Sequence, residues 1–133
     1  MLTSTRSVAV PAAALAALLL WAAPAEAGPD VENAEDQSFM ELLDQQGVLF
    51  SFNLEKYQGQ WYCRDVIDGV DSYEATENLM RDGGYSHDVA NSITSAAGAV
   101  YCFCAIREQI GAAPWPESQC SEFENNYRRT GEY

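Results

Sequence analysis

The segment SHDVANSITSAAGAVYCFCAIREQI, from Ser86 to Ile110, carries the strongest fold signal in this chain. Ser86 is a preferred helix N-cap, and Gly111 can end the helix that follows. An apolar stripe with helical spacing runs through the segment and consists of Val89, Ile93, Ala96, Ala97, Val100, Phe103 and Cys104. Four small residues at 96–99 allow a neighbouring helix to approach closely. We therefore predict one long core helix that starts after Ser86 and reaches about Ile110.

A shorter helix is predicted before this segment. Asp71 and Glu74 have the spacing of an N-terminal capping pair, and Gly83-Gly84 can end the helix. Its apolar residues are Tyr73, Leu79 and Met80.

Further upstream, Asn53 is a good N-cap for a helix that runs to about Val70. One face of this helix holds Gly59, Cys63, Val66, Ile67 and Val70. The opposite face holds Leu54, Tyr57 and Trp61. A helix that is apolar on two sides either packs between two neighbours or exposes an apolar patch.

The two ends of the mature chain are predicted to be less regular. Ser38-x-x-Glu41 is a capping-box pattern that predicts a short first helix ending at Gly47. Residues 28–36 are expected to be a mobile acidic leader, and residues 112–133 an irregular tail. The predicted fold is all-α: a compact bundle of about four helices over residues 37–111.

The first 27 residues have the layout of a secretory signal peptide. Arg6 precedes an uncharged run from Val8 to Ala23, and Ala25-Glu26-Ala27 is a small-x-small cleavage site. The alternative is a membrane anchor, which needs about 20 apolar residues, whereas this run has 16 and contains Pro11. We expect cleavage after Ala27, a secreted or extracytoplasmic product, and no stable membrane span in it.

The charge of the chain excludes one class of partner. It has 20 acidic and 7 basic residues, for a net charge of −13 at pH 7. Binding to nucleic acid draws its non-specific affinity from cationic side chains, so we expect no nucleic-acid partner. The same charge opposes an anionic membrane surface.

All four cysteines, Cys63, Cys102, Cys104 and Cys120, follow the expected cleavage site. An even number in a small exported domain predicts two disulfides. Four cysteines allow three pairings. In an unbroken helix, Cys102 and Cys104 point about 200° apart, and the apolar stripe places Cys104 inward. Periodicity by itself therefore favours Cys63 with Cys104.

The order of several motifs resembles a known family. Gly59-x-x-x-Cys63 is followed by Asp68-Gly69, by Gly84-Tyr85-Ser86 and by an Ala-rich helix that closes on Tyr101-Cys102. Together with Phe39-x-x-Leu42-Leu43 and Gln46-Gly47-Val48, they resemble the small exported mycobacterial and actinobacterial proteins of the domain of unknown function 732. The resemblance covers roughly residues 36–104.

The resemblance implies a compact helical domain with a bridge between the positions of Cys63 and Cys102. No activity comes with it, because the family has no assigned chemistry. This chain adds Cys104, Cys120 and a longer tail to the family pattern. On the resemblance we prefer Cys63 with Cys102, and Cys104 with Cys120.

We find no catalytic, cofactor or metal signature. His87 is the single histidine, it follows a helix cap, and no nucleophile motif accompanies it. Asp65, Asp68 and Asp71 do not have the ligand spacing of a calcium loop. A solvated acidic surface explains them better.

An aromatic group is the one candidate functional feature. Phe50, Phe52, Tyr57 and Trp61 could form an exposed contact patch, since Trp and Tyr concentrate binding energy at interfaces. Alternatively the tail covers them, with Trp115 stacked over Trp61 and Cys120 holding the tail in place. We favour the covered arrangement, because monomers rarely expose large apolar patches.

These observations favour a non-enzymatic, disulfide-stapled helical module that acts outside the cytoplasm by contacting an unknown protein or envelope component. The alternative is a small carrier of an apolar ligand between the helices. A hydrolase is a more distant alternative.

Overall fold

The computed structural model describes residues 28–132 and shows helices and no strand over that range. The expected signal peptide, residues 1–27, lies outside the described residues. The elements in chain order are α1 (Ala34–Gln45), α2 (Phe52–Ile67), α3 (Ser72–Gly83), α4 (His87–Val100), α5 (Phe103–Gln109), the short 3-10 helix η2 (Glu117–Gln119) and α6 (Glu122–Thr130). The prediction of an all-α, disulfide-stapled fold is confirmed.

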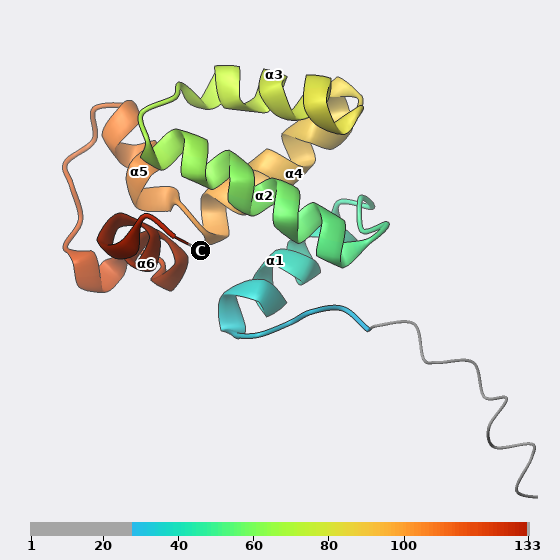
Figure 1. Cartoon of the computed structure of the whole chain (residues 1–133), viewed down its shortest axis with the longest axis horizontal. Coiled ribbons are helices and arrows are strands. Elements are labelled where there is room, and N and C mark those ends of the chain that lie inside the picture. Colours follow the sequence, from blue (N-terminus) through green and yellow to red (C-terminus); the bar gives the residue numbers. More distant parts are fainter. Residues whose placement is uncertain (1–27, 133) are drawn as a thin grey trace, which may run out of the picture.

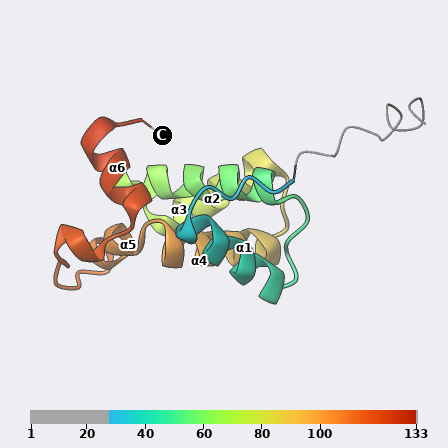
Figure 2. The same ribbon diagram turned by 90° about the horizontal axis from the view of Figure 1, so that it is seen from below.

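Helix α2 is the centre of the bundle. It packs against α3 along one side and against α4, while α1 packs on α4 (Figure 1). Figure 2 shows the same arrangement from below, with α5 and α6 together at one end of the molecule. The α3–α4 turn lies at the opposite end in both views.

A row of aromatic rings passes through the core and joins the first helix to the last. Phe39 lies 6.3 Å from Phe52 and 5.1 Å from Tyr101, measured between ring centroids, and Tyr101 lies 5.3 Å from Phe123. All four side chains are buried. Phe52, one of the residues of the predicted contact patch, is therefore a core residue.

Two helical glycines provide a matched pair of substitutions. A Cβ atom at Gly59 would lie 2.8 Å from Cζ of the buried Phe39 ring and 3.2 Å from Cβ of Ala97. At Gly98 the nearest atom, Cγ1 of Ile106, is 3.6 Å away, an ordinary contact.

We expect Gly59→Ala to lower the free energy of unfolding by about 1–3 kcal/mol through overpacking. Gly98→Ala should raise it by about 0.5–1 kcal/mol, because alanine favours the helix. Urea denaturation of both variants checks this, and equal effects would contradict it.

The predicted long helix is wrong: it is two helices, α4 and α5, bent by 102°. In a continuous helix the Ala105 amide would donate to the Tyr101 carbonyl. Here the Ser121 hydroxyl donates to the Tyr101 carbonyl, and the Ala105 amide donates to Oε1 of Glu124 at 3.0 Å. Both halves of the missing helical hydrogen bond are thus satisfied by residues at the start of α6.

Within residues 28–132, no single helix has the length and apolar character of a membrane span. Helices α4 and α5 pass that test only as a pair, with the sharp bend between them.

The two disulfides are Cys63–Cys102 and Cys104–Cys120, each with a Cα–Cα distance of 5.6 Å. This is the pairing implied by the family resemblance. The pairing that periodicity favours, Cys63 with Cys104, is wrong because the helix breaks before Cys104, so the assumed helical rotation does not apply. Cys63–Cys102 joins α2 to the α4–α5 junction in the buried core.

The first helix starts earlier than predicted. Its N-cap is Asn33, whose side-chain oxygen accepts a hydrogen bond from the Asp36 amide at 2.9 Å, and Ser38 lies inside the helix. Residues 34–36, which we expected in the leader, therefore belong to α1. The start of α2 is also shifted: Ser51 is the N-cap, and Asn53 instead accepts a hydrogen bond from the Asp30 amide. The predicted caps Asp71 and Ser86 are confirmed.

The tail is not irregular between residues 122 and 130, where it forms α6. Ser121 caps this helix by accepting from the Glu124 amide at 2.9 Å. Glu35 of α1 accepts hydrogen bonds from the amides of Glu122 and Phe123, each at 3.0 Å. The tail is thus held to the bundle by helix capping and by the buried Phe123, in addition to the Cys104–Cys120 bridge.

Candidate functional site

The structure separates the five aromatic residues of the predicted patch. Phe52 is buried in the core, whereas Phe50 is 71% exposed and lies just before α2. Tyr57 and Trp61, one turn apart on α2, are 55% and 48% exposed, with ring centroids 6.1 Å apart. Trp115 is also exposed. Tyr57 and Trp61 are thus brought together, as helical spacing predicted, but they lie exposed and not beneath the tail.

The expected cover over Trp61 is wrong. Trp115 packs against the ring of Phe103 of α5, at 5.6 Å between centroids. The guanidinium of Arg107 lies 4.1 Å from the centre of the Trp115 ring. Trp115 therefore packs on α5 and does not cover Trp61, although α6 of the tail contacts the end of α2 through the hydrogen bond from the Tyr127 hydroxyl to Asp68.

Tyr57 and Trp61 form one wall of a surface groove of about 260 Å³ between α2 and α3, which we call the aromatic groove. Its apolar lining consists of Tyr57, Trp61, Tyr62, Ala75 and Leu79. Its polar lining consists of Gln58, Asp65, Asn78 and Asp82. Helix α2 supplies one wall and α3 the other, which is why the sequence pattern of α2 could reveal only half of the groove (Figure 1).

The electrostatics of the aromatic groove are set by burial and by acidic neighbours. Burial raises the pKa of the Asp65 carboxyl above its usual value, and the negative charges of Asp68, Asp82 and Glu74 raise it further. Burial, with a smaller contribution from Asp71, raises the pKa of Tyr62 to about 12. The groove therefore combines an apolar lining with two acidic side chains, Asp65 and Asp82.

A second surface hollow, of about 560 Å³, lies where α3, α4 and α5 meet. Trp115, Phe103 and Tyr73 line it, together with polar residues of α4 such as Asn91 and Thr94. Sequence reasoning missed this hollow, because it depends on the bend between α4 and α5. Arg107, stacked on Trp115, occupies part of its edge.

A buried polar cluster links α1, α2 and the end of α4. Asp36 is fully buried, and its carboxylate accepts a hydrogen bond from the Tyr101 hydroxyl at 2.6 Å. Lys56 Nζ lies 2.8 Å from the second carboxylate oxygen and donates to the Asp30 carbonyl at 2.9 Å. Burial lowers the pKa of Lys56, but the hydrogen bond and charge of Asp36 outweigh it, so the net pKa is raised. Every charged group in this cluster has a partner, which identifies it as structural.

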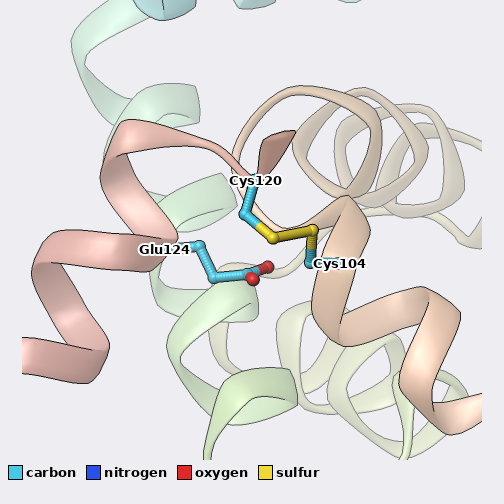
Figure 3. A group of neighbouring side chains, drawn as sticks. All are labelled: Cys104, Cys120 and Glu124. Carbon is cyan, nitrogen blue, oxygen red and sulfur yellow. A yellow bond between two sulfur atoms is a disulfide. The ribbon is translucent and has the colours of Figure 1, made fainter. Parts of the chain in front are cut away.

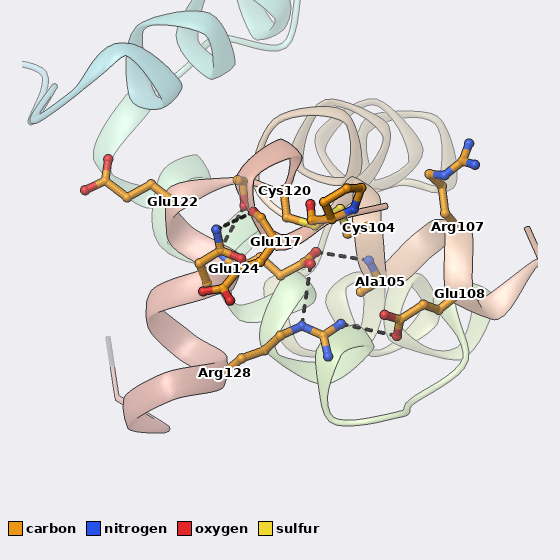
Figure 4. Close-up of a disulfide and its surroundings, with 12 residues drawn as sticks. Cys104, Ala105, Arg107, Glu108, Glu117, Cys120, Glu122, Glu124 and Arg128 are labelled. Atoms are coloured by element: carbon orange, nitrogen blue, oxygen red, sulfur yellow. Dashed lines mark hydrogen bonds and ion pairs between the residues drawn. A yellow bond between two sulfur atoms is a disulfide. The ribbon is translucent and has the colours of Figure 1, made fainter. Parts of the chain in front are cut away.

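In the described part of the chain, Cys104, Cys120 and Glu124 have ligand atoms close enough together to hold a metal ion. Figure 3 shows the Glu124 carboxylate directed toward the two sulfur atoms. The sulfurs are bonded to each other, however, and a metal binds thiolates. The carboxylate is engaged by the Ala105 amide at 3.0 Å and by Nε of Arg128 at 3.5 Å (Figure 4). With the bridge intact, these residues brace α5 against α6.

Three carboxyl groups predict an unusual dependence of stability on pH. Burial raises the pKa of Glu35 and Glu124 against the lowering effect of their amide hydrogen bonds, and burial with nearby acids raises that of Asp65. A raised folded-state pKa means that the folded protein binds these protons more tightly than the unfolded chain. The resulting stabilisation is complete below the usual carboxyl range and is lost as pH rises through the raised values.

We therefore expect the melting temperature to be higher at pH 5 than at pH 7, and the difference to shrink in Asp65→Asn. Calorimetry at constant ionic strength measures both. A melting temperature that falls steadily from pH 7 to pH 5 would contradict this expectation.

His87 is exposed at the start of α4, with Asp88 and Asn91 as its neighbours. His87 lines neither the aromatic groove nor the hollow beside Trp115, although its neighbour Asn91 lines that hollow.

A family model described as "Protein of unknown function (DUF732)" matches residues 35–103, which is more than half of the chain. The match runs from the first turn of α1 to the start of α5, so it includes both walls of the aromatic groove and the Cys63–Cys102 bridge. Searches of curated proteins and of solved structures gave no match.

Proposed function

Because the chain belongs to the family of proteins of unknown function DUF732, whose description names no activity, we propose a function from the site itself. The protein is a secreted or envelope-located helical module that acts without catalysis, by docking a partner protein in the aromatic groove. Its two disulfides are compatible with an oxidising, extracytoplasmic compartment.

The observation that carries the proposal is the exposure of Tyr57 and Trp61 above a well-packed core. Both side chains are about half exposed, although the bridge of Cys63, two residues beyond Trp61, lies fully buried in the same helix. Rings that are not needed to close the core are free to contact a partner. Tyr and Trp at the centre of an interface contribute most of its binding energy.

Two of the three carboxyl groups with raised pKa values, Glu35 and Glu124, lie at helix junctions outside the aromatic groove. Glu35 caps α6, and Glu124 holds the Ala105 amide at the start of α5. Each of these carboxylates thus has a structural task in a helix junction. The aromatic groove and the hollow beside Trp115 are both open to solvent. An open groove suits a docked surface better than the carriage of an apolar ligand, which needs an enclosed site.

Site-specific photocrosslinking tests the proposal. A photoreactive phenylalanine is introduced at position 57 of the full chain in the cells that produce it, and a matched variant carries it at position 73, which is 66% exposed outside the aromatic groove. We expect position 57 to give a discrete adduct with one polypeptide, and position 73 to give none.

A second variant separates docking from folding. Trp61→Ala should abolish the adduct while changing the free energy of unfolding by less than about 1 kcal/mol, because the side chain is half exposed. The proposal fails if position 57 gives no adduct, if both positions give the same products, or if Trp61→Ala leaves the adduct unchanged.

A further inference from the structure

Every charged side chain that lines the aromatic groove is acidic. Asp65 comes from α2 and Asp82 from α3, so the two walls each contribute one carboxylate. Among residues 28–132, the lining includes no lysine or arginine. Arg81 Nε lies 3.4 Å from Oδ1 of Asp82 in an ion pair whose two side chains are both exposed, and Arg81 itself does not line the groove.

The neighbouring basic residue, Arg64, does not line the aromatic groove. Its guanidinium lies 5.7 Å from the centre of the Trp61 ring. Arg64 lines a separate hollow on the side of Tyr127, and both Trp61 and Asp65 line that hollow as well as the aromatic groove.

Asp65 lies in an acidic part of the groove. Burial raises its pKa, and the nearby negative charges of Asp68, Asp82 and Glu74 raise it further. A positive group in the groove would remove this repulsion and would lie against aromatic rings, which attract cations. The same protein already shows such a contact at another place, where Arg107 lies 4.1 Å from the Trp115 ring centre.

The volume of the groove indicates that the cation belongs to a side chain of a partner and not to a free small molecule. Its volume of about 260 Å³ lies below the roughly 300–1,000 Å³ typical of pockets that enclose small molecules, and it opens to solvent. A single side chain projecting from a partner surface fits this space. A guanidinium suits it better than an ammonium, because it is planar, stacks on aromatic rings and binds carboxylates through two parallel hydrogen bonds.

We propose that the aromatic groove binds an arginine side chain of a basic partner polypeptide, with the guanidinium at Asp65 and Asp82 and its plane against the rings of Trp61 and Tyr62. This assignment rests on the proposed docking function and names the chemistry that the groove recognises. The net charge of −13 also favours rapid encounter with a basic partner.

Three small probes of equal backbone test the assignment: the N-acetyl, N-methylamide derivatives of arginine, lysine and norleucine. Each is titrated into the oxidised mature protein and followed by NMR at the Trp61 indole and the side-chain amides of Gln58 and Asn78. We expect the arginine probe to shift these signals with a dissociation constant on the order of 1 mM, as suits one side chain, and the other two to bind more weakly.

Charge-matched variants identify the carboxylates. Asp65→Asn and Asp82→Asn should each weaken binding of the arginine probe about fivefold, the effect of one exposed ion pair. Asp44→Asn, which removes the same charge from the exposed surface of α1, should leave it unchanged. All three variants are first shown to keep the wild-type spectrum outside the groove.

The proposal is overturned if the lysine or norleucine probe binds as tightly as the arginine probe, or if the shifts appear at Trp115 instead. It is also overturned if no signal moves up to about 50 mM probe. The same holds if Asp65→Asn, Asp82→Asn and Asp44→Asn all bind the arginine probe with equal affinity. A position-57 adduct without arginine binding would leave docking in place and reject only the arginine. Arginine binding without an adduct would reject the docking function.

Discussion

Replacing Cys63 and Cys102 together by alanine is expected to lower the free energy of unfolding by about 4 kcal/mol. The bridge spans 39 positions in sequence, and the loss of a loop of that length restores considerable freedom to the unfolded chain. Small domains have a total stability of about 5–15 kcal/mol, so this bridge is a large part of it. For a domain of about 100 residues, the melting temperature should fall by about 15–30 °C.

The second bridge is the matched control. Cys104–Cys120 spans only 16 positions, and Cys104→Ala with Cys120→Ala should cost about 3 kcal/mol or less. The hydrogen bonds of Glu35, Ser121 and Glu124 continue to hold α6 when this bridge is absent. Thermal and urea denaturation of both double variants gives the order. A larger loss from the second pair would contradict the description of Cys63–Cys102 as the core bridge.

Asp36→Ala should destabilise the fold by about 3–5 kcal/mol, although Asp36 lies in a segment that its sequence suggested to be mobile. The substitution leaves the Lys56 ammonium, whose side chain is 9% exposed, without its closest counter-charge. It also removes the acceptor of the buried Tyr101 hydroxyl. An unpaired buried charge costs far more than the pair itself contributes.

A double-variant cycle separates the charge from the packing. Adding Lys56→Met to Asp36→Ala should recover part of the stability, because no unpaired charge remains. Urea denaturation of the two single variants and the double variant gives the coupling energy. Losses that simply add would show that Asp36 and Lys56 are not energetically coupled, contrary to their 2.8 Å contact.

The sequence predicted those parts of the fold that depend on local hydrogen bonding. Asp71 and Ser86 cap α3 and α4 as expected, because a short polar side chain before an apolar periodic segment satisfies the first free amides of the helix. The Cys63–Cys102 pairing followed from the family resemblance and not from periodicity. Gly84, in the left-handed conformation, ends α3 as predicted.

The break after Val100 could not be predicted locally, because no proline lies near it and no glycine lies between Gly98, inside α4, and Gly111. It depends on Ser121 and Glu124, which replace the missing helical hydrogen bond from about 20 residues away in sequence. One signal was present: Ser121-Glu122-Phe123-Glu124 has the pattern of a capping box and indicates a helix in the tail. The start of the first helix was misplaced for a similar reason, since Asn33 and Asp36 also have the spacing of an N-terminal cap.

The aromatic groove was predicted in part. The helical spacing of Tyr57 and Trp61 placed them on one face of α2, but the opposite wall depends on how α3 packs. The packing of α3 on α2, and not the local sequence, decides that Leu79 and Asp82 lie across from Trp61. Trp115 was assigned to the wrong partner for the same reason, because the bend that brings α5 beneath it was not expected.

We propose that this chain is exported and that two specific disulfides lock its fold. A peptide map of the mature protein, made without reduction after alkylation of free thiols, examines both points at once. We expect a first residue of Gly28, linked peptides that join Cys63 to Cys102 and Cys104 to Cys120, and no alkylated cysteine. A chain that retains residues 1–27 and carries four alkylated cysteines would contradict it.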